Sequence, residues 1–125
     1  VAELACARID GADIAIVAYG TSSRVSVAAM KLSRERGLKV GLFRPITLWP
    51  FPKVRLAELS ARIKKFLAVE MSLGQMVEDV QLAVNGRAEV HLHAKPGAAV
   101  MTAGEVYKTL ENILKKGAKE YAAAK

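Results

Sequence analysis

The sequence has little of what several classes of protein require. Its 125 residues include one cysteine, Cys6, which excludes an internal disulfide and any metal or iron–sulfur site built from cysteines of this chain alone. No apolar run reaches the roughly 18 residues of a membrane-spanning helix, and no secretory signal peptide is visible. The length fits one domain, and the single cysteine fits a reducing compartment. We therefore expect a cytoplasmic location without membrane contact.

Aromatic residues are also few, at 6% of the chain, whereas basic residues outnumber acidic ones to give a net charge of +7. Such a charge suggests a nucleic-acid or an acidic partner. The basic residues are scattered, however, and no aromatic side chain is interleaved with them as a base-stacking platform requires. We therefore expect no nucleic-acid partner.

Strand and helix patterns alternate along the chain. Short apolar runs predict strands at 13–19, 39–43, 65–71 and 89–93. Four helices are predicted. The first follows the Thr21–Ser22–Ser23 cluster and ends just before Gly37, and the second has Pro52 in its first turn. The third follows Ser72 and the fourth follows Thr102. This alternation implies an α/β domain with a mostly parallel sheet and helices on both faces.

The two ends of the chain carry weaker patterns. Residues 1–11 are compatible with a short helix or an edge strand, and residues 117–125 with a frayed tail. We therefore expect a single domain over 1–116, with 1–11 as an uncertain edge segment.

Candidate site residues follow the predicted strands, because ligands of such sheets gather beyond the carboxyl ends of the strands. The loop at Gly20 could hold a phosphate or simply cap a helix. Glu70 could act as an acid or base, pair with Arg44, or be solvated. His91 and His93 face one side of a strand, as two metal ligands or as an exposed strand face. No catalytic constellation is recognisable, so we assign no catalytic, cofactor-binding or metal-binding residue.

The segment FRPITLWPFP, residues 43–52, is unlike the rest. It holds the only Trp, two of three Phe and three of four Pro. The prolines fix an extended, stiff path. Its aromatics could cover the domain's own core or form a permanent interface, and both interpretations remain open.

Two blocks of the sequence resemble a known family. The run VAYGTSSRVSVAAMKLSRERGLKVGLFRPITLWPFP, followed by VEMSLGQMVEDVQLAVNGRAEV, is similar to the carboxyl-terminal part of the α subunit of 2-oxoacid:ferredoxin oxidoreductases. The resemblance covers about residues 12 to 115. It implies a transketolase carboxyl-terminal-like fold: a three-layer α/β/α sandwich of five strands with one antiparallel edge strand, the fifth strand lying before Asp13. It also implies that 13–19 is flanked by 39–43 and 65–70, with 89–93 outermost on the latter side.

The resemblance further implies a function. The family's holoenzyme oxidatively decarboxylates a 2-oxo acid to acyl-coenzyme A and reduces ferredoxin, using thiamine diphosphate, magnesium and a four-iron, four-sulfur cluster. This domain would hold none of these cofactors, would be inactive in isolation, and would pack against the rest of the α subunit and the other subunits. A stand-alone domain that binds a small molecule or anion is the alternative.

Interface candidates follow from the same comparison. They are Arg44, Pro45, Ile46, Leu48, Trp49, Pro50, Phe51, Glu70, Met71 and Gln75. In isolation, the apolar part of this set could drive self-association.

Overall fold

The structure is a computed structural model that describes residues 4–45, 52–70, 75–94 and 101–116. Its strands are β1 Leu4–Ala7, β2 Ile14–Ala18, β3 Val40–Pro45, β4 Lys65–Glu70 and β5 Glu89–Ala94. Its helices are α1 Thr21–Glu35, α2 Lys53–Leu59, α3 Gln75–Val84 and α4 Ala103–Lys116. No helix within these ranges is both long enough and apolar enough to cross a membrane.

The strands form one sheet in the order β1-β3-β2-β4-β5. Strands β3, β2, β4 and β5 pair in parallel, whereas β1 pairs antiparallel with β3. Both the strand order and the antiparallel edge strand before Asp13 are therefore confirmed. Residues 4–7 form a strand rather than a helix, which settles the alternative left open by the sequence.

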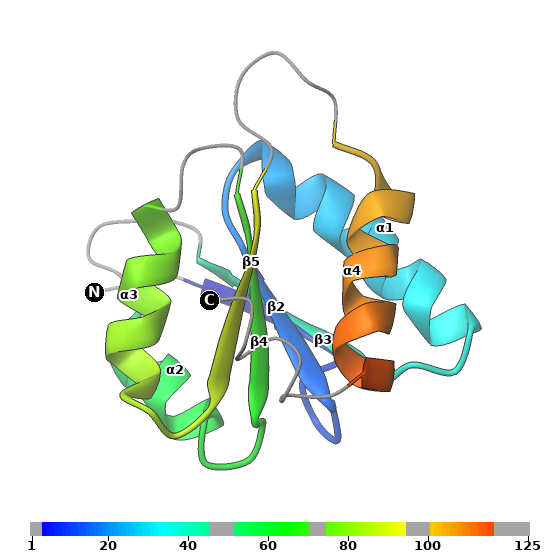
Figure 1. Cartoon of the computed structure of the whole chain (residues 1–125). Coiled ribbons are helices and arrows are strands. Elements are labelled where there is room, and N and C mark those ends of the chain that lie inside the picture. Colours follow the sequence, from blue (N-terminus) through cyan, green and yellow to red (C-terminus); the bar gives the residue numbers. More distant parts are fainter. Residues whose placement is uncertain (1–3, 46–51, 71–74, 95–100, 117–125) are drawn as a thin grey trace.

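Helices cover both faces of the sheet, α2 and α3 on one and α1 and α4 on the other (Figure 1). Each face has its own apolar core, because alternate residues of a strand point to opposite faces. On β2, Ala15 and Val17 join the α2–α3 side, while Ile14 and Ile16 join the α1–α4 side. This explains why the strand reads as a continuous apolar run.

The end of α1 and the start of α4 agree with the residues predicted to terminate and cap them. Gly37 lies just past the end of α1, as predicted, with a φ of 86°. Its N–H donates to Arg34 O and that of Leu38 donates to Ser33 O, which makes the ending a Schellman motif. The Thr102 hydroxyl accepts from Glu105 N at 3.2 Å, as the predicted cap of α4 requires.

Three local predictions were wrong. The N-cap of α1 is Gly20, without a side-chain cap, because the Ser22 and Ser23 hydroxyls donate to carbonyls instead. Pro52 precedes α2 as its N-cap rather than lying in the first turn. Arg44 and Pro45 belong to β3 rather than to a loop, because the pairing of Ala5 and Leu4 with them extends the strand.

Candidate functional site

The carboxyl ends of β2, β3 and β4 form the edge where the sequence places a site, and we call it the carboxyl edge. The chain passes from β2 to β3 on one side and, later, to β4 on the other. The topological switch point therefore lies beyond β2, at the start of α1. The described residues here are Tyr19 to Ser23, Arg44, Pro45 and Glu70.

The junction of β2 and α1 uses its hydroxyl groups to hold the fold. Gly20 has a φ of 66°, a value that favours glycine and turns the chain sharply into the helix. The buried Ser22 Oγ lies 2.7 Å from Tyr19 O and 3.0 Å from Val69 O, and Ser23 Oγ donates to Gly20 O at 2.6 Å. These hydroxyls join α1 to the ends of β2 and β4, and they give the anion hypothesis no support.

Glu70 is a buried carboxylate at the end of β4. Only 6% of the residue is exposed. Its Oε1 accepts from Met76 N at 2.7 Å and its Oε2 from Val77 N at 3.0 Å. These two N–H groups lie in the first turn of α3, where no partner within the helix is available. The carboxylate therefore anchors the start of α3, where the helix dipole also favours a negative charge.

The earlier interpretations of Glu70 need correction. Solvation is wrong, because the side chain is buried. Among the ion pairs of the described residues, none joins Glu70 to Arg44, which is exposed on β3. Spacing along the chain gave no signal for this capping role, because an ordinary capping side chain lies at the helix start and not six residues before it.

The histidines lie on the α4 side of the sheet. His91 is buried, with Nε2 at 3.6 Å from Glu89 Oε2, and His93 Nδ1 lies 2.8 Å from the Thr109 hydroxyl on α4. Both thus face one side, as predicted, but that side is packed against a helix and is not an exposed strand face. Within the described ranges, no group of three His, Cys, Asp or Glu side chains is close enough to hold a metal ion.

Cys6 is exposed on the edge strand β1. Partial burial of the sulfur raises the pKa of the thiol, and the neighbouring Arg55 guanidinium opposes this effect. A raised pKa leaves less of the thiolate that would act as nucleophile.

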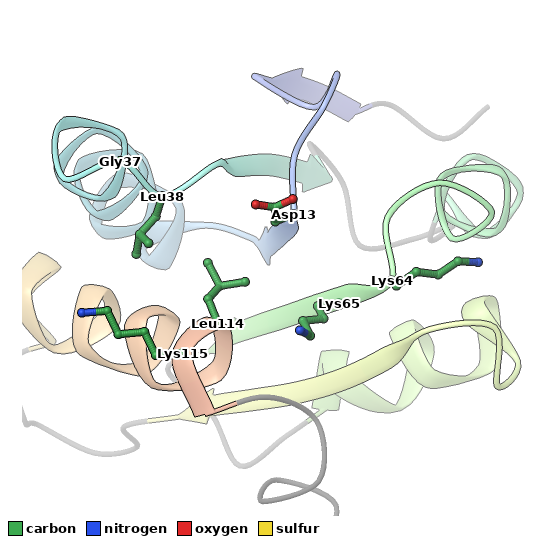
Figure 2. A pocket seen from close by; sticks show the side chains of 7 residues that line it. All are labelled: Asp13, Gly37, Leu38, Lys64, Lys65, Leu114 and Lys115. Atoms are coloured by element: carbon green, nitrogen blue, oxygen red, sulfur yellow. The ribbon is translucent and has the colours of Figure 1, made fainter.

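The opposite edge of the sheet, at the amino ends of β2 to β5, carries a hollow of about 420 Å³. It is lined by Asp13, Gly37, Leu38, Lys64, Lys65, Leu114 and Lys115. Figure 2 shows Leu38 and Leu114 directed into the hollow, whereas Lys64 and Lys115 extend away from it. Residues from separate loops, from the start of β4 and from the end of α4 gather here. Sequence analysis did not identify this edge, because only the fold brings these segments together.

Most interface candidates cannot be placed. Ile46, Leu48, Trp49, Pro50, Phe51 and Met71 lie outside the described residues. Of the others, Pro45 is buried, Arg44 is exposed, and Gln75 begins α3.

Comparison with known proteins gives a consistent picture. Residues 12–112 match the family model for pyruvate:ferredoxin oxidoreductase core domain II. The chain is 42% identical over 105 residues to the ketoisovalerate oxidoreductase subunit VorB of Methanothermobacter thermautotrophicus, covering 84% of this chain and 30% of VorB. It is 39% identical over 97 residues to the 2-oxoglutarate synthase subunit KorA of Methanothermobacter marburgensis, covering 78% of this chain and 26% of KorA.

A solved structure shares the fold. It is a 2-oxoglutarate:ferredoxin oxidoreductase from Magnetococcus marinus, with a TM-score of 0.74 and 20% identity over 90% of this chain and 20% of that one. The chain spans less than a third of the length of the relatives named above. It belongs to the family of pyruvate:ferredoxin oxidoreductase core domain II, a domain of the α subunit of 2-oxoacid:ferredoxin oxidoreductases.

Proposed function

We propose that this chain is a non-catalytic assembly domain of a thiamine diphosphate-dependent 2-oxoacid:ferredoxin oxidoreductase. The holoenzyme oxidatively decarboxylates a 2-oxo acid, transfers the acyl group to coenzyme A and reduces ferredoxin. The named relatives act on ketoisovalerate or 2-oxoglutarate, and the chain covers only a part of each. The chemistry would therefore require domains or subunits beyond this one.

The observation that carries the proposal is the use of polar side chains at the carboxyl edge. Glu70 binds two backbone N–H groups, and Ser22 and Ser23 bind backbone carbonyls. A catalytic acid, base or nucleophile must instead present its polar atoms to a substrate. These side chains stabilise the junctions between strands and helices.

Two cofactors of the holoenzyme, the iron–sulfur cluster and magnesium, lack a fitting set of ligands in the cysteine content of this chain and in its described residues. One cysteine cannot supply the four thiolates of an iron–sulfur cluster. The described residues also bring together no set of three metal-type ligands that could hold the magnesium of a bound diphosphate. We propose that thiamine diphosphate, magnesium and the cluster are bound by other parts of the enzyme.

The segment from Arg44 to Pro52 is proposed as the main docking surface toward those parts. Its borders support this role: Pro45 and Pro52 are buried and fix the ends, while Arg44 is exposed and can reach a partner carboxylate. Ordering a flexible side chain on binding costs about 0.5–1.5 kcal/mol. A stiff segment avoids much of this cost, because its conformational entropy is already low before binding.

Calorimetric titration of the chain with thiamine diphosphate and magnesium tests the cofactor assignment. No saturable heat is expected, whereas the assembled oxidoreductase should bind the cofactor and serve as the positive control. Micromolar binding to the chain alone would contradict the proposal. Mixing the chain with the remaining subunits, followed by size-exclusion chromatography, tests assembly directly.

A further inference from the structure

The amino edge of the sheet concentrates the positive charge of the chain. We define it as the segments leading into β2 to β5, at 8–13, 36–39, 60–65 and 85–89, together with Leu114 and Lys115 at the hollow. Its basic residues are Arg8, Arg36, Lys39, Arg62, Lys64, Lys65, Arg87 and Lys115, and its acidic residues are Asp10, Asp13 and Glu89. Eight against three leaves five of the seven net positive charges of the whole chain at this edge.

Part of this charge serves the fold. Helices α1, α2, α3 and α4 end here, and cations near helix carboxyl ends are stabilising. Lys64 Nζ donates to Ser60 O, Arg87 to Ala83 O, and the Arg36 guanidinium lies 4.9 Å from the centre of the Tyr107 ring. Arg62 and Lys115 pair with the carboxylates of Asp10 and Glu111.

Three cations remain without such a role: Arg8, Lys39 and Lys65. Lys39 and Lys65 make no ion pair and no side-chain hydrogen bond among the residues that the structure describes. They stand at the starts of β3 and β4, the two strands that flank β2. Lys39 is exposed, whereas Lys65 is half-buried and lies opposite Glu89 of β5 in the register. Because neither lysine forms an ion pair within the described ranges, both charges are available to an acidic partner.

The arrangement fits an extended acidic surface better than a small anion. Lys64 and Lys115 extend away from the hollow and do not converge on one point inside it (Figure 2). The hollow itself is bordered by the half-buried apolar side chains of Leu38 and Leu114. An apolar centre within a charged rim is the usual anatomy of a protein–protein interface.

Nucleic acid is less well matched. Tyr107 of α4, whose ring is covered by Arg36 of this edge, is buried and offers no face for base stacking. Asp10, Asp13 and Glu89 are interspersed with the cations, and such a mixture suits a protein surface of mixed charge better than a uniform row of phosphates.

We propose that the amino edge is a second docking surface, which receives a carboxylate-rimmed surface of another subunit of the oxidoreductase, with an apolar partner side chain entering the hollow. The inference rests on the proposed assembly function. It places this contact at the end of the sheet opposite the segment at Arg44 to Pro52, so that the domain bridges two neighbours.

The test uses the assembled oxidoreductase that carries this chain. A carbodiimide joins lysine amines directly to carboxylates in contact, and peptide mapping then locates the links. We expect links from Lys39 or Lys65 to Asp or Glu of another subunit, which disappear when salt is raised from about 50 to about 250 mM. The double substitution Lys39→Glu with Lys65→Glu should weaken subunit binding about tenfold at the lower salt concentration.

A matched control carries the same change of net charge elsewhere. Arg24→Glu with Lys31→Glu alters two exposed positions on α1, and should weaken binding less than about threefold. Equal weakening by both variants would overturn the inference, because net charge alone would explain it. Assembly without cross-links from the amino edge would also overturn it. The same holds if Lys39 and Lys65 bind a 20-nucleotide single strand more tightly than they bind the subunit. If the unchanged chain does not assemble with the other subunits at all, both this inference and the proposed function are wrong.

Discussion

At the carboxyl edge of the sheet, Glu70 and Ser22 bind backbone groups through their oxygens, whereas at the amino edge Lys39 and Lys65 make no ion pair or side-chain hydrogen bond in the described ranges. The described polar groups of one edge thus hold the fold together, and the other edge leaves an excess of cations. In many parallel α/β proteins the carboxyl edge carries the chemistry. We propose from this difference that the surfaces of the domain bind other protein rather than a substrate.

The largest expected effect concerns the internal role of Glu70. Replacing Glu70 by Ala leaves two backbone N–H groups of α3 without their charged acceptor, and hydrogen bonds to charged groups contribute about 1.5–3 kcal/mol each. We expect a loss of about 3 kcal/mol in the free energy of unfolding, measured by urea denaturation.

Lys65 provides the matching stability test at the amino edge. Lys65→Ala should change the free energy of unfolding by less than about 0.5 kcal/mol, because the side chain makes no ion pair or hydrogen bond in the described part of the chain. Equal losses for Glu70→Ala and Lys65→Ala would erase the contrast between the two edges.

Trp49→Ala tests the docking segment and is expected to act on assembly. If Trp49 anchors an interface, subunit binding weakens by about 2 kcal/mol or more while the chain itself keeps its stability. A loss of about 3–5 kcal/mol in the free energy of unfolding would instead show that Trp49 belongs to the core of this domain. Isothermal titration of the subunits and urea denaturation of the chain separate the two.

Gly41→Ala tests how tightly the amino edge is packed beneath its charged surface. A Cβ at Gly41 would lie 2.8 Å from Arg8 O and 3.2 Å from Ile9 Cα, both backbone atoms. Because neither can yield without moving the turn between β1 and β2, we expect destabilisation of about 1–3 kcal/mol.

Its control is Gly104→Ala on α4. There the nearest atom, Thr102 Oγ1, lies 3.9 Å away, so the substitution should stabilise the domain by about 0.5–1 kcal/mol. The same thermal or urea unfolding measurement serves for both. Destabilisation at Gly104 as large as that at Gly41 would show that steric crowding is not the cause.

Much of the fold was predictable because local rules and burial agree. The continuous apolar run of β2 needs two covered faces, and Gly37 needs the positive φ that ends α1. The strand order came from the family resemblance and is confirmed. The N-cap of α1 was mispredicted because Ser22 has a stronger long-range use, a bond to Val69 O 47 residues away.

The site was less predictable for the same physical reason. The role of Glu70 depends on where α3 begins relative to β4, and the excess charge of the amino edge depends on which loops the sheet brings together. Neither follows from spacing along the chain. Sequence patterns report local backbone preferences and burial, whereas these features arise from segments joined in three dimensions.

The smallest expected effect concerns Glu111, beside the amino edge on α4. The Tyr107 hydroxyl donates to its Oε2 at 2.8 Å and Lys115 Nζ lies at 3.2 Å, and these contacts lower the pKa of the Glu111 carboxyl below its ordinary value of 4.5. A carboxyl whose pKa is lower in the folded state stabilises the fold above the unfolded-state pKa, and this contribution is lost as the pH falls through the folded-state pKa. The stability difference between the unchanged chain and Glu111→Gln should therefore shrink as the pH falls from about 6 to about 3. Asn112→Ala, which removes no titrating group from the same helix, should show an offset that does not vary with pH. Thermal unfolding across this range measures both, and a Glu111→Gln difference that stays constant would show that these contacts do not favour the ionised carboxylate.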